Sequence, residues 1–368
     1  MSNKGSGNFN RRKFIGALSS GLVLPFAAPS FVRAQSKETI VVSAGGGAYE
    51  QAYKETVIQP FMKETGIDVI YKTQLAESNI KAQVDSGNVQ VDVAELTGTP
   101  FRQNPQELLE EIDYSHFAKD TVAGLLPQAK QKYGVGSYVY SSVMAYSLAD
   151  WPDGKPRPNT WAEFWDLTKF PGPRTLQAAS AGHATTLAFA LIADGVDPKN
   201  LYPLDLDRAF KSLDRIKSRV TKFWTIGVEP AQLLSDRQVT LGSAWNGRIQ
   251  ALKDQRAPVD FTWNQGELSQ AYWMIPKGTK HKEAAMRFLA YTSSAAAQAR
   301  FQSRLAYGPT NANAIKLMDP KIAAQLPTAP GNLEKQFWRD DRWLNQIGAN
   351  GKPNRDIMID RWTKWVIS

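Results

Sequence analysis

The sequence predicts an α/β protein of two lobes with a ligand cleft between them. Stretches with strand character alternate with amphipathic helical stretches in two separate runs, residues 38–96 and residues 174–254. Strands that alternate with helices indicate a parallel sheet, whose ligands bind beyond the carboxyl ends of the strands. Extended segments near 134–147 and 270–276 join the two runs, so the chain crosses between lobes and can close around a ligand by a hinge motion.

The first run predicts strands at residues 38–44, 66–73 and 89–96 and helices at residues 48–64 and 78–87. Tyr53, Val57 and Phe61 share one face of the first helix, and Pro60 predicts a kink in it. The segment GVGSYVYSSVMAYS, residues 134–147, has no helical period. It is therefore expected to form one long strand.

The second run begins after a stretch rich in proline and glycine, where Thr160 and Glu163 form a capping box for a helix. Strands are expected at residues 174–180, 222–227 and 239–245, and helices at residues 185–195, 205–220, 230–236 and 247–254. A strand at 270–276 then leads back to the first lobe and to a helix at 281–293. The predicted first lobe is 35–137 plus 272–320, the second is 138–271, and 321–368 are C-terminal helices that pack on the lobes.

The first 34 residues have the plan of an export signal. Arg11 and Arg12 precede a short apolar stretch diluted by serine and glycine, and Val32-Arg33-Ala34 closes the segment. That stretch is shorter than the roughly 20 apolar residues of a membrane span. The paired arginines favour the twin-arginine route, with an ordinary secretory signal as the alternative, and both predict cleavage near Ala34 and a periplasmic or extracellular protein.

Composition excludes several classes of function. The chain has 368 residues, 42% hydrophobic and 21% charged, which is the balance of a soluble globular protein. Without residues 1–34 it keeps 39 basic and 35 acidic residues, too small an excess to predict a nucleic-acid partner. The sequence has no cysteine, no G-x-S-x-G, no H-E-x-x-H and no EF-hand loop. We therefore expect no enzyme activity, no metal and no cofactor, and we expect His116, His183 and His281 to be structural or solvated.

Small residues follow four of the predicted strands, where a ligand could approach the backbone. The Gly45–Gly47 loop, with Gly46 at its centre, could bind an anion or be a simple tight turn. Ser180 lies in Ala178-Ala179-Ser180-Ala181-Gly182, at the end of the strand at 174–180, and Tyr307 precedes a Gly-Pro turn that could equally be structural.

The fourth strand end is GSAWNGR, residues 242–248, a strand-to-helix turn that carries Trp245, Asn246 and Arg248. We place Arg248 at the second helical position, where a cation opposes the helix dipole unless an anion lies in front of it. Arg248 therefore either points into solvent or binds a ligand.

Aromatic residues at strand ends and crossovers could form a box for a small solute, although packing in a core explains each of them equally well. They are Tyr49, Tyr138, Tyr140, Trp224, Trp245 and Trp273.

The mature chain resembles the exported solute-binding proteins of ABC importers, in the group that includes spermidine/putrescine and 4-aminobutyrate binders. The resemblance rests on the order and spacing of several motifs: GGGAYEQAYKETVIQPFMKETGIDV, TWAEFWDLTKFPGPR, GSAWNGR, AYWMIPKGTKHKEAAMRFLAY and LAYGPTN. It implies a periplasmic-binding fold of the second type, no catalysis, and delivery of a captured solute to an inner-membrane permease and its ATPase. We expect the protein to be a monomer.

The resemblance also bears on the ligand. Polyamine binders of this group usually place carboxylates at the positions of Gly182, Thr185 and Ala271, none of which is acidic here. Burying ammonium groups without carboxylates is costly, whereas an arginine after the WNG turn suits a carboxylate. We therefore expect Arg248 to hold the carboxylate of a small organic or amino acid, Trp245 and Trp273 to cover its apolar part, and Glu95 to meet an amine.

The full predicted set of ligand-binding residues is Gly46, Tyr49, Glu95, Tyr138, Ser180, Trp224, Trp245, Asn246, Arg248, Trp273 and Tyr307. The function predicted from it is the substrate-binding component of an ABC importer. A polyamine binder with an aromatic box is the alternative ligand class. A secreted enzyme or a receptor-linked sensor on the same scaffold is the alternative of another class.

Overall fold

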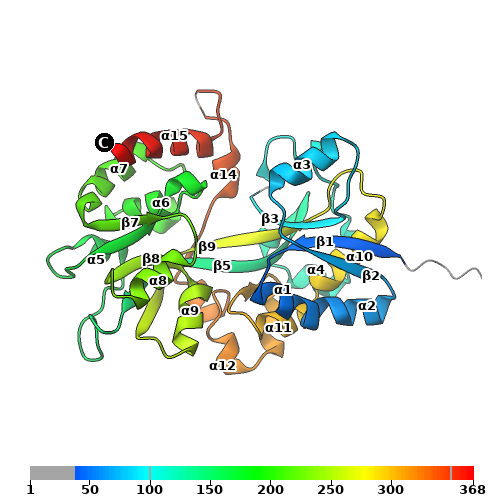
Figure 1. Ribbon diagram of the computed structural model, residues 1–368, viewed down its shortest axis with the longest axis horizontal. Coiled ribbons are helices and arrows are strands. Elements are labelled where there is room, and N and C mark those ends of the chain that lie inside the picture. Colours follow the sequence, from blue (N-terminus) through cyan, green and yellow to red (C-terminus); the bar gives the residue numbers. More distant parts are fainter. Residues whose placement is uncertain (1–37, 99–100, 349) are drawn as a thin grey trace, which may run out of the picture. The chain divides into compact units, whose positions relative to one another are not determined.

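A computed structural model describes residues 38–98, 101–348 and 350–368, so the predicted export signal lies outside the described residues. The described chain is a mixed α/β structure built on one large sheet with strand order β2-β1-β3-β9-β5-β8-β6-β7. The long strands β5 (Gly134–Ser147) and β9 (Val259–Met274) run side by side through the middle of it (Figure 1). No helix in this part of the chain has the length and apolar character that crossing a membrane requires.

The N-terminal half of the sheet is parallel and carries the first set of helices. Its strands are β1 (Thr39–Ala44), β2 (Asp68–Thr73) and β3 (Val93–Thr97), with β1 between the other two. The helices of this half are α1 (Ala48–Tyr53), α2 (Gln59–Thr65), α3 (Glu77–Asp85), α4 (Lys119–Gly124), α10 (Lys282–Thr292) and α11 (Ala295–Gln302). A π-helical turn, Lys54–Ile58, joins α1 to α2 just before Pro60, so the predicted single helix is interrupted where the kink was expected.

The other half repeats the arrangement with β6 (Arg174–Gln177), β7 (Val220–Trp224) and β8 (Leu241–Trp245), in which β6 pairs in parallel with both neighbours. Its helices are α5 (Trp161–Trp165), α6 (Thr185–Ala193), α7 (Leu206–Asp214), α8 (Glu229–Ser235) and α9 (Asn246–Asp254). The capping box at Thr160 is confirmed, since the Thr160 hydroxyl accepts from the backbone N–H of Glu163 over 3.2 Å.

The last part of the chain returns across both halves. It forms β10 (Gly308–Pro309), α12 (Pro320–Ala323), α13 (Pro330–Leu333), β11 (Phe337–Trp338), α14 (Asp341–Asn345) and α15 (Asn354–Ile367). A two-residue strand β4 (Lys130–Gln131) and 3-10 turns complete the elements, the turns at Pro105–Glu107, Tyr114–His116, Pro127–Ala129, Ala179–Ala181, Pro198–Asn200, Lys217–Arg219 and Ala312–Leu317.

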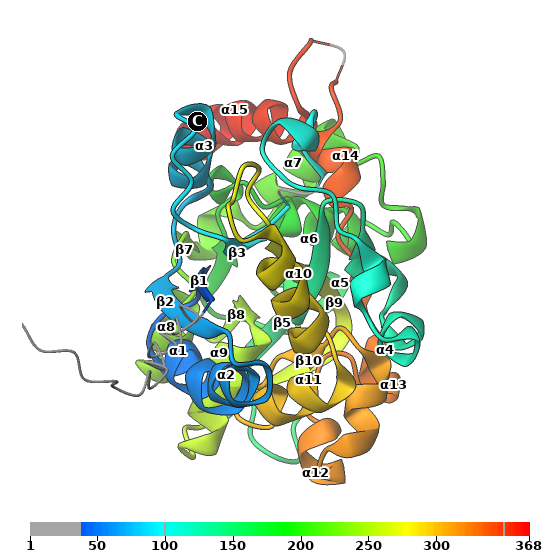
Figure 2. The same cartoon turned by 90° about the vertical axis from the view of Figure 1, so that its right-hand side faces the viewer.

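Each half has its own hydrophobic core. One core gathers the helices α1, α2, α10 and α11 on β1 and β3, and Figure 2 looks onto α10, whose Phe288 packs edge-on against Trp273 of β9. The other gathers α5, α6 and α7 on β6 and β8, and α15 adds Met358 and Trp362 to it. Two separate cores agree with two lobes, while the lobe boundaries given above stay a prediction.

We expect Trp161→Ala to lower the free energy of unfolding by about 3–5 kcal/mol, because it empties a packed site and removes a buried donor. The Trp161 ring stacks on Phe189 with centroids 3.7 Å apart, and its Nε1–H donates to the Gln265 carbonyl over 2.9 Å. Guanidinium unfolding measures the loss. The matched control, Trp263→Ala, removes a half-buried ring outside both cores and should cost about 1 kcal/mol or less. Equal losses in the two variants would contradict this account of the second core.

Candidate functional site

The strand register brings the carboxyl ends of β3 and β8 to a short central stretch of β5 and β9. Thr97, at the end of β3, lies opposite Ala271 of β9. Trp245, at the end of β8, lies opposite Ser142 of β5, which in turn lies opposite Glu267 of β9. The strands of both halves therefore end around residues 137–142 and 267–271, which form the floor of the cleft between the lobes, and such switch points are where ligands bind in α/β sheets.

This floor is polar although it is buried. Among the described residues, four of its side-chain atoms have no hydrogen-bond partner: Ser141 Oγ, Glu267 Oε2, Ser269 Oγ and Gln270 Oε1. Buried polar atoms are normally hydrogen-bonded. Their concentration here indicates groups that a polar solute can satisfy.

Glu95 of β3 is a buried carboxylate on the wall of the first lobe. Its side chain accepts from the Tyr49 hydroxyl over 2.5 Å and from the Ser137 hydroxyl, and it has no cationic partner in the described part of the chain. Burial raises the pKa of Glu95 from 4.5 to about 7, although hydrogen bonds from Ser137, Tyr49 and the Gly45 backbone act to lower it. A ligand cation that reaches this carboxylate would stabilise its ionised form.

A row of aromatic rings leads from Glu95 to the GSAWNGR turn. The Tyr138 ring lies 4.5 Å from that of Tyr307, 5.8 Å from that of Tyr49 and 6.3 Å from that of Tyr140, measured between centroids. Tyr140 in turn meets Trp245 edge-on at 5.8 Å. These rings form a row of aromatic contacts between Glu95 and the turn.

Arg248 lies at the far end of this row, on the first turn of α9. The helix begins at Asn246, one residue earlier than the sequence suggested, so Arg248 is its third residue. Its side chain is exposed and forms no ion pair with a described residue. Burial raises the pKa of Tyr307, and the Arg248 charge opposes that shift while the Glu95 charge adds to it.

Asn246 has a structural place at the turn. Its side chain is fully buried, Oδ1 accepts from the Ser141 N–H over 2.9 Å, and Nδ2 donates to the Ala306 carbonyl over 2.9 Å. The amide therefore ties the turn to the cleft floor and to the segment that precedes Tyr307.

Three of the other predicted residues are distributed between core and surface. Trp224 and Trp273 are buried in the two halves, where Trp224 Nε1 donates to the Ser243 carbonyl over 2.9 Å and Trp273 packs on Tyr53 and Phe288. Gly46 is exposed on the loop after β1. Both indoles are buried in the cores, so neither exposes a face to a ligand in this structure.

A second buried carboxylate, Glu267, lies on the floor and was missed by the sequence reasoning. Its Oε1 accepts from the Thr185 hydroxyl over 2.7 Å, and burial raises its pKa from 4.5 to about 7, against the charge of Arg339. Thr185 is one of the positions at which the sequence lacks a carboxylate. In the structure the carboxylate of Glu267 contacts Thr185 from a strand 82 residues away in the chain, which no local pattern could reveal.

Arg339 and His183 extend this group toward α15. Arg339 donates to Asp341 from Nε over 2.8 Å and from Nη2 over 3.2 Å, and its Nη1 lies 3.0 Å from His183 Nδ1. The same residues line a cavity of about 250 Å³ between the end of β3 and the turn that carries Ser180. Ser180, a predicted site residue, is exposed at this place.

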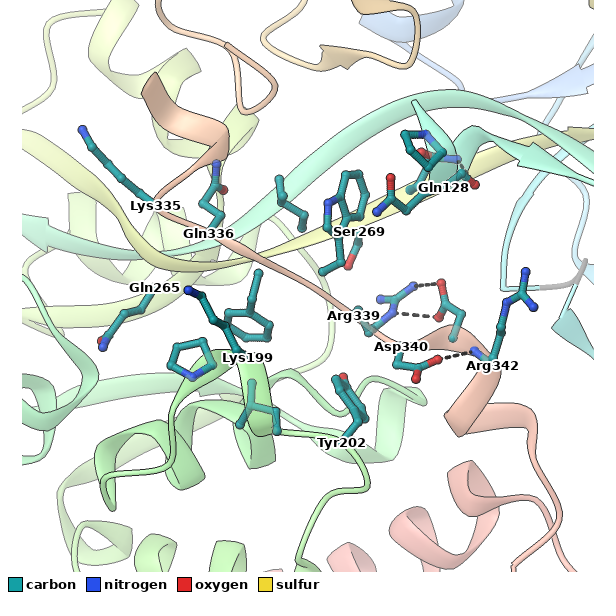
Figure 3. Close-up of a pocket in the computed structure, with 18 of the residues that line it drawn as sticks. Gln128, Lys199, Tyr202, Gln265, Ser269, Lys335, Gln336, Arg339, Asp340 and Arg342 are labelled. Carbon is teal, nitrogen blue, oxygen red and sulfur yellow. Dashed lines mark hydrogen bonds and ion pairs between the residues drawn. The ribbon is translucent and has the colours of Figure 1, made fainter. Parts of the chain in front are cut away.

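A larger cavity of about 910 Å³ lies along the segment that crosses between the halves (Figure 3). In Figure 3 this segment carries Gln336 and Arg339, with Ser269 of β9 on one side and Tyr202 on the other. None of the predicted site residues lines it. Its lining carries as many basic as acidic side chains. The basic ones are Lys199, Lys335, Arg339 and Arg342, and the acidic ones are Asp197, Glu334, Asp340 and Asp341.

Within the described ranges, no three His, Asp or Glu side chains gather as a metal site would need. The structure places the buried carboxylate of Glu95 near one end of the aromatic row and the exposed Arg248 on the turn at its other end. The fold and the site together define a two-lobe binding protein for a small polar solute.

Comparison with known proteins agrees with this class. The family model of the bacterial extracellular solute-binding proteins matches residues 56–330, so the chain belongs to that family. The 4-aminobutyrate-binding protein of Pseudomonas aeruginosa is 35% identical over 335 residues, 86% of this chain and 90% of that protein. The spermidine/putrescine-binding periplasmic protein of Escherichia coli is 22% identical, over 80% of this chain and 84% of that protein.

Solved structures support the same assignment. An ABC transporter substrate-binding protein of Bradyrhizobium japonicum matches with a TM-score of 0.81 at 37% identity. The match covers 89% of this chain and 99% of that chain. A structure described as a GABA receptor has a TM-score of 0.78 at 37% identity, with 89% and 98% covered. The chain is thus a substrate-binding component of an ABC transporter, and its family and relatives are solute-binding proteins, not enzymes, with periplasmic members.

We expect Asn246→Ala to lower the free energy of unfolding by about 2 kcal/mol or more, because the Ser141 N–H and the Ala306 carbonyl then lose their partner. Chemical denaturation measures the change. Asn88→Ala makes the same substitution at an exposed site and should change stability by about 0.5 kcal/mol or less. If Asn246→Ala weakens ligand binding but leaves stability unchanged, Asn246 contacts the ligand and the structural interpretation is wrong.

Proposed function

We propose that this chain captures a small zwitterion for import, with the ligand carboxylate at Arg248 and the ligand ammonium at Glu95. The observation that carries the proposal is the pair of uncompensated opposite charges at the two ends of the aromatic row. Tyr138, Tyr140, Tyr307 and Trp245 would cover the apolar chain between the ligand's charged groups. Gly46 and Tyr49 would border the ammonium end.

The place of Arg248 favours a carboxylate over other ligands. A guanidinium and the free N–H groups of a helix first turn attract an anion together. Arginine can also bind a carboxylate with two parallel hydrogen bonds, which fixes the orientation of the ligand. A ligand carboxylate thus removes the unfavourable contact between Arg248 and the dipole of α9.

The relatives support an ω-amino acid. A 4-aminobutyrate-binding protein is 35% identical to this chain, and a structure described as a GABA receptor is 37% identical. We therefore propose 4-aminobutyrate or a close analogue as the ligand class. The second candidate is a short diamine, because the described residues include a second buried carboxylate, Glu267, in addition to Glu95.

The remaining proposals concern delivery and location. The loaded protein would pass its solute to an inner-membrane permease and its ATPase as a monomer. Export by the twin-arginine route, with cleavage near Ala34, would bring it to the periplasm. Presentation of the ligand to a membrane sensor is the alternative, and uptake of labelled ligand by cells with and without the gene separates the two.

We expect Arg248→Gln to weaken 4-aminobutyrate binding by about tenfold to a hundredfold, because a charge-assisted pair is worth about 1.5–3 kcal/mol. Isothermal titration calorimetry measures the affinity. Arg287→Gln is the matched control, since Arg287 is exposed on α10 and should leave binding unchanged. Unaltered affinity in Arg248→Gln would overturn the carboxylate site, and binding of putrescine alone would favour the diamine.

We expect affinity for 4-aminobutyrate to fall by about tenfold or more from pH 8 to pH 5.5. The ligand stays zwitterionic over this range, but the Glu95 carboxyl, with a pKa of about 7, takes up a proton as the pH falls and then no longer attracts an ammonium. Glu95→Gln should bind more weakly and show a flat profile. Glu267→Gln, the matched control, should keep the slope, and a slope that survives in Glu95→Gln would remove Glu95 from the ammonium site.

A further inference from the structure

A second polar cavity opens at the α15 end of the cleft. It has a volume of about 250 Å³ and lies between Gly98, just after β3, and the turn after β6 that carries Ser180. Thr97, His183, Arg339, Asp341 and Arg355 complete its polar lining. The cavity is therefore bordered by both lobes and by the first turn of the last helix.

The hydrogen bond between Arg339 and His183 determines what the imidazole can offer. An arginine only donates, so His183 Nδ1, 3.0 Å from Arg339 Nη1, must accept. Burial lowers the pKa of His183 to about 3, with the charges of Arg339 and Arg355 adding to the shift. The ring is then neutral and carries its one proton on Nε2, which is a donor.

Arg355 supplies the second donor and a charge. Its Nε has no hydrogen-bond partner among the described residues, although the atom is buried. Arg339 donates a hydrogen bond to each of the two carboxylate oxygens of Asp341. The lining of the cavity thus holds two guanidinium groups and one carboxylate. Outside the lining, the charge of Glu267 acts on Arg339 and that of Glu77 acts on Arg355.

The backbone at Gly98 lets a guanidinium approach the end of β3. Gly98 has a φ of +72°, and a Cβ built there would lie 3.0 Å from Arg355 Nη2, so glycine lets the guanidinium approach the end of β3. The exposed Ser180 hydroxyl faces the same cavity and adds a further polar group. Its free polar groups are therefore donors, or hydroxyls that can donate.

We propose that this cavity is a second anion subsite, which binds an additional carboxylate or other oxyanion of the ligand through Arg355, His183 and Ser180. The inference rests on the proposed function, because it adds an acidic group to the zwitterion held by Glu95 and Arg248. Thr97, at the rim, is two residues from Glu95 on the same strand, a span of about 7 Å. One small ligand can therefore place its ammonium at Glu95 and an acidic group in the cavity.

The ligand class that follows is an amino acid with two acidic groups. Three matched pairs of ligands test it by calorimetry: L-aspartate with 3-aminopropanoate, L-glutamate with 4-aminobutyrate, and 2-aminoadipate with 5-aminopentanoate. The members of each pair differ by one carboxylate. We expect at least one diacid to bind the wild-type protein tenfold or more tightly than its monoacid partner.

Arg355→Gln should lower the affinity for that diacid by tenfold or more and the affinity for the monoacid by less than threefold. Arg361→Gln is the matched control on the same helix, where Arg361 pairs with Asp207 at 2.6 Å, and it should leave both affinities unchanged. Ser180→Ala, at an exposed residue, should reduce the preference for the diacid by a fewfold. This second variant tests the subsite without a change of charge.

The proposal of a second anion subsite is contradicted if the wild-type protein prefers no diacid, or if Arg355→Gln weakens the binding of diacid and monoacid equally. These results differ from failure of the proposed function, in which Arg248→Gln leaves monoacid binding unchanged. A preference for a diacid that Arg355→Gln abolishes, with monoacid binding kept, supports the subsite.

Discussion

The antiparallel pairing of β5 with β9 is the constraint on which the rest of this structure depends. The two strands pair from Val135 opposite Trp273 to Ser147 opposite Val259, and the register shifts between Gly136 and Val139 and between Ser142 and Met144. Bulges bend strands and re-aim side chains. Both irregularities border the floor of the cleft, so the same pairing that joins the two halves also directs the polar side chains at which their parallel strands end.

The electrostatics of the cleft follow from this placement. Glu95 is buried by the first half and Arg248 stands on the first turn of a helix in the second, and each would gain from an opposite charge. Charges in a partly buried cleft interact more strongly than in water. In the proposed binding mode a zwitterion would contact both halves, which would link binding to closure of the lobes.

Much of the fold could be predicted because it depends on local patterns. The strand β5, the capping box at Thr160 and the strand-to-helix turn before Arg248 all follow from short-range periodicity and capping chemistry. The early start of β9 could not, because residues 264–267, among which Gln265 adopts a positive φ, carry no large apolar side chain and interrupt the alternation of Val259, Phe261 and Trp263. Glu267, Arg339 and His183 were missed for another reason: they meet through contacts between distant segments, and a single histidine or arginine carries no sign of its partner.

The structure of the protein in complex with 4-aminobutyrate tests the central claim most directly. The account predicts the ligand carboxylate within hydrogen-bonding distance of the Arg248 guanidinium and the ammonium beside Glu95, with its carbon chain against Tyr138, Tyr307 and Trp245. A ligand bound in the reverse orientation, or held elsewhere without contact to Arg248 and Glu95, would contradict it.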